Sequence, residues 1–432
     1  MKKIIQWKLK ILAKLILAKY QPEIIGITGS VGKTSAKEAI AAVLATKFNL
    51  RKNIKNYNNE IGLPLTIIGA DSAGKSIFGW LAVFIRGLKL IFLTDKNFPK
   101  ILVLEMAADR PGDLSYLMSI VKCRIGVITR IGPVHLEHFG SLEKVQQEKS
   151  ILVKKLAKTA WAVLNYDDEK VIALTKVTPA QVLTYGLTAG AQIRAQELSF
   201  SYNGLANQNN HISGTSFKLS YAGSAVPVFL AQALGEPNVY AVLAAAAVGI
   251  IYGFNLVEIS QALKKYSSPK GRLKIIAGIK QTLIIDDTYN ASPQSSQQAL
   301  EILSQIPITA PASRYAVLGD MLELGSISEE AHQQIGKLVV KLKIDKLIIV
   351  GERARDIARG AISAGMSADQ IFYFADCQSA GLFIQARIKP GDLILVKGSQ
   401  GIRMEKIVKE IMAEPLRAKE LLVRQGSEWE KR

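Results

Sequence analysis

The sequence predicts an α/β protein in which a P-loop-type, mostly parallel central sheet domain is followed by a second α/β domain. Three observations predict this class. Apolar strand-like runs alternate with helix-favouring segments along most of the chain. A glycine-rich turn separates the first of these runs from a helix-favouring segment. With 432 residues, of which 49% are hydrophobic and 21% are charged, the chain is long enough for two or three domains.

The glycine-rich turn is the strongest functional signal. Residues 24–35 read IIGITGSVGKTS and lead into a helix-favouring segment, residues 36–45. Backbone N–H groups in such a turn and at a helix start bind phosphate, Lys33 can reach terminal phosphates, and the Thr34 hydroxyl can hold Mg²⁺. We therefore expect a nucleoside triphosphate here, and a turn that only joins a strand to a helix is the alternative. The candidate ATP-binding residues of the turn are Gly29, Ser30, Val31, Gly32, Lys33, Thr34 and Ser35.

Two polar residues follow later strand-like runs. Residues 101–104 end at Glu105, and residues 125–129 lead towards His135. Because ligands of parallel sheets gather at the carboxyl ends of strands, Glu105 and His135 are expected to face the bound phosphates and to bind metal. A purely structural role for each side chain is the alternative.

Composition limits the classes of binding partner and the cellular compartment, but it does not identify a partner. The net charge of +19 favours anionic partners, namely nucleotides, nucleic acid or an acidic membrane face. Cys123 and Cys377 are far apart and lack metal-ligand spacing, and the start of the chain has no small-residue cleavage pattern. A reducing cytoplasm is the expected location.

The first twenty residues contain six lysines and no acidic residue. As a helix, this segment is expected to have an apolar side formed by Ile4, Ile11 and Leu15. Lys3, Lys10 and Lys14 are expected roughly opposite, and Lys8 and Lys19 interrupt the apolar side. A second apolar stretch, residues 77–93, is short and charged for a bilayer span. For each stretch, a helix packed on the domain and a helix lying on a membrane surface are both open.

The spacing of the glycine-rich turn carries a family resemblance. Where a usual P-loop has its first glycine, this chain has Ile27, and the pattern is Gly26-x-x-Gly29-x-x-Gly32-Lys33-Thr34. This pattern resembles the Mur ligase and folylpolyglutamate synthetase superfamily, whose members are ATP-dependent ligases that join a carboxylate to an amine. Further runs, at residues 56–66, 104–106, 135–141, 148–149, 286–293, 318–325 and 397–401, are similar to the ordered motifs of the MurF branch, over about residues 22–411.

The resemblance implies an activity. MurF ligases of peptidoglycan precursor synthesis add D-alanyl-D-alanine to a UDP-MurNAc-tripeptide through an acyl phosphate, using ATP and Mg²⁺. For this chain it implies two Mg²⁺ ions, a muramyl-peptide acceptor and D-Ala-D-Ala as partners, and a cytoplasmic location. A related ligase with a different or lipid-linked acceptor is the alternative. A basic P-loop ATPase acting on nucleic acid is a weaker one, because aromatic-basic interleaving and a helix-turn-helix signal are missing, so no nucleic acid is expected. A catalytically dead membrane scaffold would not need the site residues.

The resemblance also implies roles for individual residues. Thr34 and Glu105 would bind one Mg²⁺ and His135 a second, and Lys149 matches a lysine that is carbamylated and so becomes a metal ligand. An ordinary surface lysine is the alternative for Lys149. The implied catalytic residues are Lys33, Glu105, His135, Lys149 and Arg272, the last matching an arginine that reaches the γ-phosphate from another domain. The implied additional nucleotide contacts are Asn238, Asp287, Tyr289 and Asn290, for the last three of which simple turn residues are the alternative. The implied substrate contacts are Asn58, Asn59, Asp320, Glu323, Lys397 and Ser399.

Two departures from the family pattern affect these expectations. Residues 235–241 read GEPNVYA where the family usually has Gly-x-His-Asn-x-x-Asn, so a histidine and an asparagine are replaced. MurF proteins also carry a uridine-nucleotide-binding domain before the P-loop, whereas fewer than 30 residues precede it here. Recognition of the UDP end is expected to be lost, rebuilt or supplied by a partner chain.

The expected organisation has four parts. A cationic apolar helix (1–20), which is a candidate for contact with the inner face of the membrane, precedes a central ATP-binding domain (21–270) with a strand-rich insert at about 192–230. A carboxy-terminal domain (271–413) resembles the family's Rossmann-like domain, which brings in the amine. A charged tail (414–432) is expected to be a solvated helix or to lack fixed structure.

Overall fold

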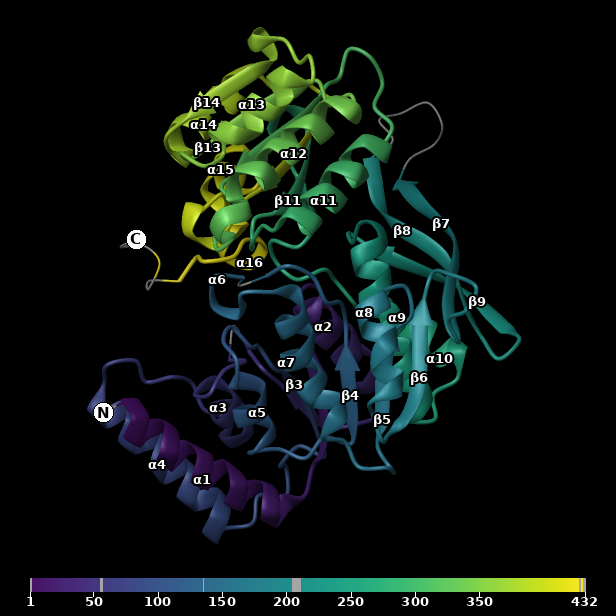
Figure 1. Ribbon diagram of the computed structural model, residues 1–432, viewed down its shortest axis with the longest axis vertical. Coiled ribbons are helices and arrows are strands. Elements are labelled where there is room, and N and C mark those ends of the chain that lie inside the picture. Colours follow the sequence, from purple (N-terminus) through teal and green to yellow (C-terminus); the bar gives the residue numbers. More distant parts are fainter. Residues whose placement is uncertain (1, 55–56, 135, 204–210, 427–428, 430–432) are drawn as a thin grey trace. The chain divides into compact units, whose positions relative to one another are not determined.

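The computed structural model describes residues 2–54, 57–134, 136–203, 211–426 and 429. The chain forms two compact units (Figure 1). The first comprises residues 1–198, 217–229 and 236–266, and the second comprises residues 199–216, 230–235 and 267–432. The predicted α/β class with large, mostly parallel sheets is confirmed.

The first sheet has the strand order β2-β3-β1-β4-β5-β6-β7-β8-β9. Its strands are β1 (Glu23–Thr28), β2 (Leu50–Lys52), β3 (Ile101–Glu105), β4 (Ile125–Ile128), β5 (Trp161–Asn165), β6 (Gln181–Gly186), β7 (Ile193–Asn203), β8 (His211–Tyr221) and β9 (Ser224–Ala231). The strands from β2 to β7 pair in parallel. β3 and β4 are buried along their whole length, as the continuous apolar runs of a sheet covered on both faces require. Pairing of Ile27 with Glu105 brings the end of β3 beside the loop that follows β1.

Helices of the first unit cover this sheet. They are α1 (Lys2–Tyr20), α2 (Lys33–Leu44), α3 (Gly62–Ile68), α4 (Ile77–Phe92), α5 (Asp113–Met118), α6 (Leu136–Phe139), α7 (Leu142–Lys154), α8 (Glu169–Ile172), η1 (Ala173–Lys176), α9 (Gly235–Ile251) and α10 (Leu256–Leu263). Packing of α1 on the domain, one of the two expectations for this segment, is confirmed by Leu9 and Ile16, whose side chains are fully buried in the core. In the described part of the chain, no helix is both long and apolar enough to cross a membrane.

The arrangement expected within α1 is wrong in one respect, the placement of the lysines. Ile4, Ile11 and Leu15 form an exposed apolar stripe. At about 100° per residue, Lys3, Lys10 and Lys14 flank this exposed apolar stripe on one edge instead of standing opposite it. The other side of the helix is also apolar, and its residues Leu9, Leu12, Ala13 and Ile16 are buried in the core.

The second sheet has the order β10-β11-β15-β12-β13-β14, and only β10 runs antiparallel to its neighbour. Its elements are β10 (Lys274–Ala277), η2 (Ile279–Gln281), β11 (Leu283–Asp287), α11 (Pro293–Gln305), β12 (Arg314–Gly319), η3 (Gly325–Ile327), α12 (Ser328–Lys341), β13 (Lys346–Val350), α13 (Arg355–Ser363), η4 (Ala368–Gln370), β14 (Ile371–Phe374), α14 (Cys377–Arg387), β15 (Leu393–Lys397), η5 (Gln400–Ile402), α15 (Glu405–Ile411), η6 (Pro415–Arg417) and α16 (Ala418–Leu421). Ala418 and Leu422 of the expected solvated tail are instead buried in the core of this unit.

Candidate functional site

The loop between β1 and α2 has the backbone of an anion cradle. Gly29 has φ 149°, and a Cβ atom there would lie 2.0 Å from the Thr129 Oγ1 atom, so no other residue fits without a shift. Gly32, with φ 87°, is the residue before the 12-residue helix α2. The loop therefore leads directly into the positive end of a helix dipole, where phosphate groups bind.

Side chains hold this loop in shape. The Ser30 hydroxyl donates to the Gly132 carbonyl at 2.9 Å and accepts from its N–H at 3.0 Å. Thr129 donates from Oγ1 to the Val31 carbonyl at 2.6 Å, and Lys33 donates from Nζ to the Gly29 carbonyl at 2.6 Å. Ser30 thus fixes the loop to the segment after β4 through its hydroxyl and through its backbone N–H, which donates to the Arg130 carbonyl at 2.6 Å.

Thr34 and Glu105 meet at the end of β3. The Thr34 hydroxyl donates to Glu105 Oε2 at 3.0 Å, and Asn58 donates from Nδ2 to Oε1 at 3.0 Å. Glu105 is only 4% exposed. A hydroxyl beside a buried carboxylate is a ligand pair that a hard cation such as Mg²⁺ prefers, so the residues present fit a metal ion next to a phosphate cradle.

Two residues that the sequence analysis missed support Glu105. Lys37 lies one helical turn after Lys33 and is 2% exposed, with Nζ 2.9 Å from the Asn53 carbonyl oxygen and 3.8 Å from Glu105 Oε2. The Asn53 side chain, 1% exposed, accepts from the Glu105 N–H and donates to the Glu105 carbonyl. The signal for Lys37 was its position four residues after Lys33, which places both lysines on the same side of α2. Apolar residues such as Ile40 follow it and are buried.

Lys149 lies on α7 and is 1% exposed, so it is not the surface lysine of the alternative. Burial, followed by the positive charge of Lys33, lowers the pKa of the Lys149 amine to about 7, although the carboxylates of Asp109 and Glu148 act in the opposite direction. A large share of this amine is therefore neutral at physiological pH. The Glu148 carboxylate has a structural role. It accepts hydrogen bonds from the N–H groups of Gly112 and Leu114 and so fixes the start of α5.

Two predicted binding residues of the first unit have partners within the protein. Asn59 Oδ1 accepts the N–H groups of Ile61 and Gly62 at 3.2 and 2.9 Å, which supports the start of α3. Asn238, on α9, is 2% exposed and accepts from the Tyr266 hydroxyl at 2.8 Å. Of the other predictions for this unit, Ser35 is buried on α2, and His135 lies outside the described residues.

The second unit gathers several predicted residues at the carboxyl ends of β11, β12 and β15. Lys397 Nζ lies 2.6 Å from Asp287 Oδ2 and donates to the Asn290 carbonyl at 3.0 Å. Ser399 Oγ accepts from the Leu322 N–H at 2.9 Å. These bonds fasten the loops after three neighbouring strands to one another.

Asp320 and Glu323 belong to the loop after β12. Asp320 Oδ1 accepts from the Ala354 N–H at 2.8 Å, and burial raises the pKa of its carboxyl group. Glu323 is exposed and has φ +64°. His332, which the sequence analysis missed, is fully buried behind this loop: its Nε2 atom accepts from the Met321 N–H at 2.9 Å, so the ring is neutral, and burial lowers its pKa.

Arg272 and Tyr289 lie together. The Arg272 guanidinium carbon is 4.1 Å from the centre of the Tyr289 ring, which is cation–π geometry. Arg424, another residue that was missed, donates to the Thr288 carbonyl at 3.0 Å and also to the Tyr289 carbonyl, while Glu405 Oε2 lies 2.8 Å from it. A basic residue in a mixed-charge tail carried no signal in the sequence for this role.

Comparisons with known proteins agree on one family. The Mur ligase middle domain matches residues 27–78 and 85–249, and the Mur ligase glutamate ligase domain matches residues 271–400. The UDP-N-acetylmuramoyl-tripeptide--D-alanyl-D-alanine ligase of Bacillus subtilis is 30% identical over 405 residues, which are 94% of this chain and 79% of the relative. The Escherichia coli enzyme of the same name is 28% identical over 404 residues, 93% of this chain and 79% of that one.

Solved structures give the same result. MurF ligase from Thermotoga maritima in complex with ADP superposes with a TM-score of 0.77 at 26% identity, covering 96% of this chain and 84% of that one. MurF from Acinetobacter baumannii superposes with a TM-score of 0.76 at 25% identity, covering 93% and 79%.

Proposed function

Because the chain belongs to the Mur ligase family of ATP-dependent ligases, we propose that it adds D-alanyl-D-alanine to a UDP-MurNAc-tripeptide in peptidoglycan precursor synthesis. The similarity to enzymes of that name, at 30% identity over 94% of the chain, supports the substrates. The observation that carries the proposal is the Thr34–Glu105 contact of 3.0 Å at the end of the Gly29–Lys33 cradle. It joins a phosphate-binding loop to a metal-binding carboxylate.

We propose that the reaction has two steps. The terminal carboxylate of the acceptor peptide attacks the γ-phosphorus of ATP, and the bond to the ADP oxygen breaks. The amine nitrogen then attacks the acyl carbon, loses a proton, and inorganic phosphate leaves. In both steps negative charge builds up on phosphoryl and acyl oxygens, so the protein contributes mainly cations and positioning.

Lys33 is the residue proposed to neutralise the transferring phosphoryl group. It starts α2 and already lies over the loop through its bond to the Gly29 carbonyl. The N–H groups at the start of α2 orient the phosphates, and Arg272 is proposed as a second cation for the γ-phosphate. Asn238, Asp287, Tyr289 and Asn290 remain proposed nucleotide contacts.

Bound Mg²⁺ would neutralise phosphate charge and orient the attacking oxygen. Thr34 and Glu105 would hold one ion, and His135 and a carbamylated Lys149 are proposed ligands for a second. Among the described residues, no three His, Cys, Asp or Glu side chains are grouped to hold a metal. A carboxylate formed on Lys149 would supply an additional ligand, and the pKa of about 7 supports it because only a neutral amine reacts with CO₂.

The amine substrate is proposed to enter at the carboxyl ends of β11, β12 and β15. In open α/β sheets such edges are the usual binding crevices. Asp320 and Glu323 are anionic residues there, suited to the ammonium group of a dipeptide, and Lys397 and Ser399 suit its carboxylate. Asn58 is proposed as a contact for the acceptor beside Glu105. We place the reaction in the cytoplasm, where ATP is available.

Measurement of phosphate release from ATP with a panel of acceptors and amines tests this function. The panel combines UDP-linked and lipid-linked muramyl tripeptides with D-Ala-D-Ala, D-Ala, L-Ala-L-Ala and D-glutamate. We expect turnover that requires Mg²⁺, a UDP-linked acceptor and D-Ala-D-Ala. Turnover only with the lipid-linked acceptor, or only with a single amino acid, would replace the proposed substrates. ATP hydrolysis stimulated by nucleic acid and by none of these would refute the ligase proposal.

A further inference from the structure

Helices α1 and α4 lie side by side along one edge of the first unit, at the lower left of Figure 1. Large apolar side chains on both helices are exposed, from 37% for Ile11 to 85% for Phe78. We call this set the α1/α4 surface: Ile4, Trp7, Ile11 and Leu15 from α1, and Ile77, Phe78, Leu81, Ile85, Leu88, Phe92 and Leu93 from α4 and its end. Half of the exposed large apolar residues in the described chain lie here, so this is a patch and not a scatter.

The two helices present this surface in the same direction because their opposite sides share one core. Leu9 and Ile16 of α1 and Val83 and Leu90 of α4 are buried in the same cluster. The helices approach closely where a Cβ atom on Gly87 would lie 2.9 Å from Leu12 Cδ1.

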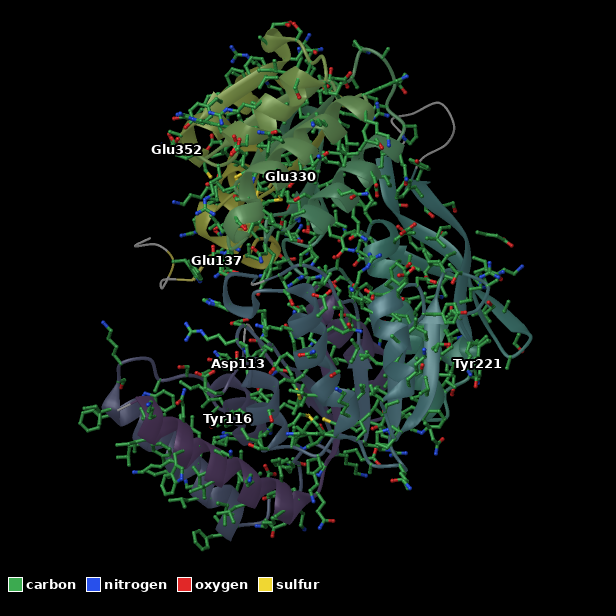
Figure 2. All side chains as sticks on the ribbon, in the orientation of Figure 1. Asp113, Tyr116, Glu137, Tyr221, Glu330 and Glu352 are labelled. Carbon is green, nitrogen blue, oxygen red and sulfur yellow. The ribbon has the colours of Figure 1, made fainter. Side chains whose placement is uncertain are left out.

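Bonds beyond the core also hold α1 in place. Lys19 Nζ donates to the carbonyls of Leu90, Ile91 and Leu93 at the end of α4. Lys10 Nζ lies 4.5 Å from the centre of the Tyr116 ring on α5, a residue labelled in Figure 2. Both helices are therefore fastened to the unit with their outer apolar sides exposed.

The two helices that form this surface, and the residues next to them, carry positive charge only. Residues 1–22 and 72–94 contain nine lysines and arginines and no aspartate or glutamate. By helical geometry, Lys8 flanks the apolar stripe of α1 on one edge, and Lys3 and Lys14 flank it on the other. The side chains of all three are exposed.

We propose that the α1/α4 surface docks on a bilayer containing anionic phospholipids, with the apolar stripes at the acyl boundary and the lysines at the headgroups. Apolar side chains bordered by lysines are the composition of helices that lie in a membrane interface. A second copy is disfavoured as the occupant, because an isologous dimer would bring two equally positive surfaces together. Residues 1–26 and 79–84 lie outside the family matches, and the proposal is independent of the ligase activity.

Vesicle flotation with the full chain tests the docking proposal. Deleting α1 would expose the core that Leu9 and Ile16 fill, so exposed residues are substituted instead. The charge variant carries Lys3→Gln, Lys14→Gln, Lys75→Gln and Lys89→Gln, and the apolar variant carries Trp7→Ser, Phe78→Ser and Phe92→Ser. The matched control carries Lys337→Gln, Lys341→Gln, Lys389→Gln and Lys409→Gln, which remove four exposed charges from the second unit. Thermal melts verify that each variant is folded.

We expect the full chain and the control to float with phosphatidylglycerol-containing vesicles at low salt and not with phosphatidylcholine alone. Both surface variants should bind at least about tenfold more weakly, because each removes headgroup charges or interfacial side chains. Negligible binding by the full chain, or an equal loss of binding by the control, would overturn the proposal. Light scattering without lipid gives a further test. A dimer of the full chain that becomes monomeric only in the apolar variant would also overturn the proposal, since a second copy would then cover the surface.

Discussion

The two groups of predicted site residues differ in the way their charges are arranged. In the first unit, two basic side chains act on each other: the positive charge of Lys33, together with burial, lowers the pKa of the Lys149 amine to about 7, so this amine readily gives up its charge. In the second unit, opposite charges are paired, since Lys397 Nζ lies 2.6 Å from Asp287 Oδ2. Burial next to another cation disfavours the charged form of an amine, whereas removing one partner of a buried, hydrogen-bonded ion pair leaves an uncompensated charge and is strongly destabilising.

This difference indicates that the two groups of site residues have different roles. A polyanion such as ATP would offset the positive charge of Lys33 in the first unit, so substitution of Lys33 should reduce activity more than stability. The pair in the second unit ties loops together, so its loss should reduce stability first.

Lys33→Ala should have the largest effect. We expect kcat to fall about 10³-fold, as when one transition-state donor is removed, with a nearly unchanged melting temperature. ADP release measured against the matched variant Lys158→Ala, an exposed lysine of the same unit, isolates the effect. Wild-type turnover by Lys33→Ala would show that the phosphate-binding assignment is wrong.

Lys397→Met should instead destabilise the protein by about 3 kcal/mol, because Asp287 would be left buried without its cation. Urea unfolding measures this loss. In the double variant Lys397→Met/Asp287→Leu no buried charge remains, and part of the lost stability should return. If Lys397→Met lowers the free energy of unfolding by less than about 1 kcal/mol, which is typical of solvated ion pairs, the pair does not stabilise the second unit as proposed.

Lys149→Ala should reduce kcat about 10²-fold if its carbamate holds metal. Formate or acetate should restore part of the activity by occupying the vacated space with a carboxylate. Lys149→Arg serves as the control, since arginine keeps a charge and cannot form a carbamate, and it should not be rescued. Full activity with an unmodified Lys149 amine, seen by mass spectrometry of the intact enzyme, would contradict the carbamate.

Lys37→Met should cost about 2 kcal/mol of stability, the range for hydrogen bonds to charged groups. The Lys37 ammonium lies 3.8 Å from Glu105 Oε2, and a bound Mg²⁺ would supply the missing positive charge. Addition of Mg²⁺ and ADP should therefore raise the melting temperature of the variant more than that of the wild type. Equal gains would mean that Lys37 only supports Asn53.

The smallest effect concerns pH. Only the neutral Lys149 amine reacts with CO₂, and its pKa of about 7 lies below the ordinary value of 10.5. Reactivation of CO₂-depleted enzyme by added bicarbonate should therefore be fast above pH 7 and slow about tenfold for each pH unit below it. A reactivation rate that is constant from pH 6 to 8, after correction for dissolved CO₂, would contradict the pKa.

Local patterns predicted the first unit better than the second. The glycine-rich turn and the apolar run ending at Glu105 are contiguous signals, and parallel pairing brought their ends together. The role of Asn53 could not be predicted, because it depends on a strand 52 residues further on and on a buried amide that has no periodicity.

Tertiary packing determines other features that a local pattern does not. Both sides of α1 are apolar, so the helical pattern alone could not choose the buried one. The Asn59 side chain supports the start of α3, and its proposed substrate contact stays a prediction. Arg424 and His332 act through loops that are distant in sequence, and no spacing rule connects them to residues 288 and 321.

The distance along the chain between α1 and its partners has a consequence for synthesis on the ribosome. Its partners are made much later: Lys19 bonds to Leu90, 71 residues on, and Lys10 to Ser119, 109 residues on. At about 5–20 residues per second, α1 waits on the order of ten seconds with both apolar sides uncovered. During that interval the nascent helix is more apolar than the finished one, so a chaperone or a membrane can meet it before the rest of the domain exists.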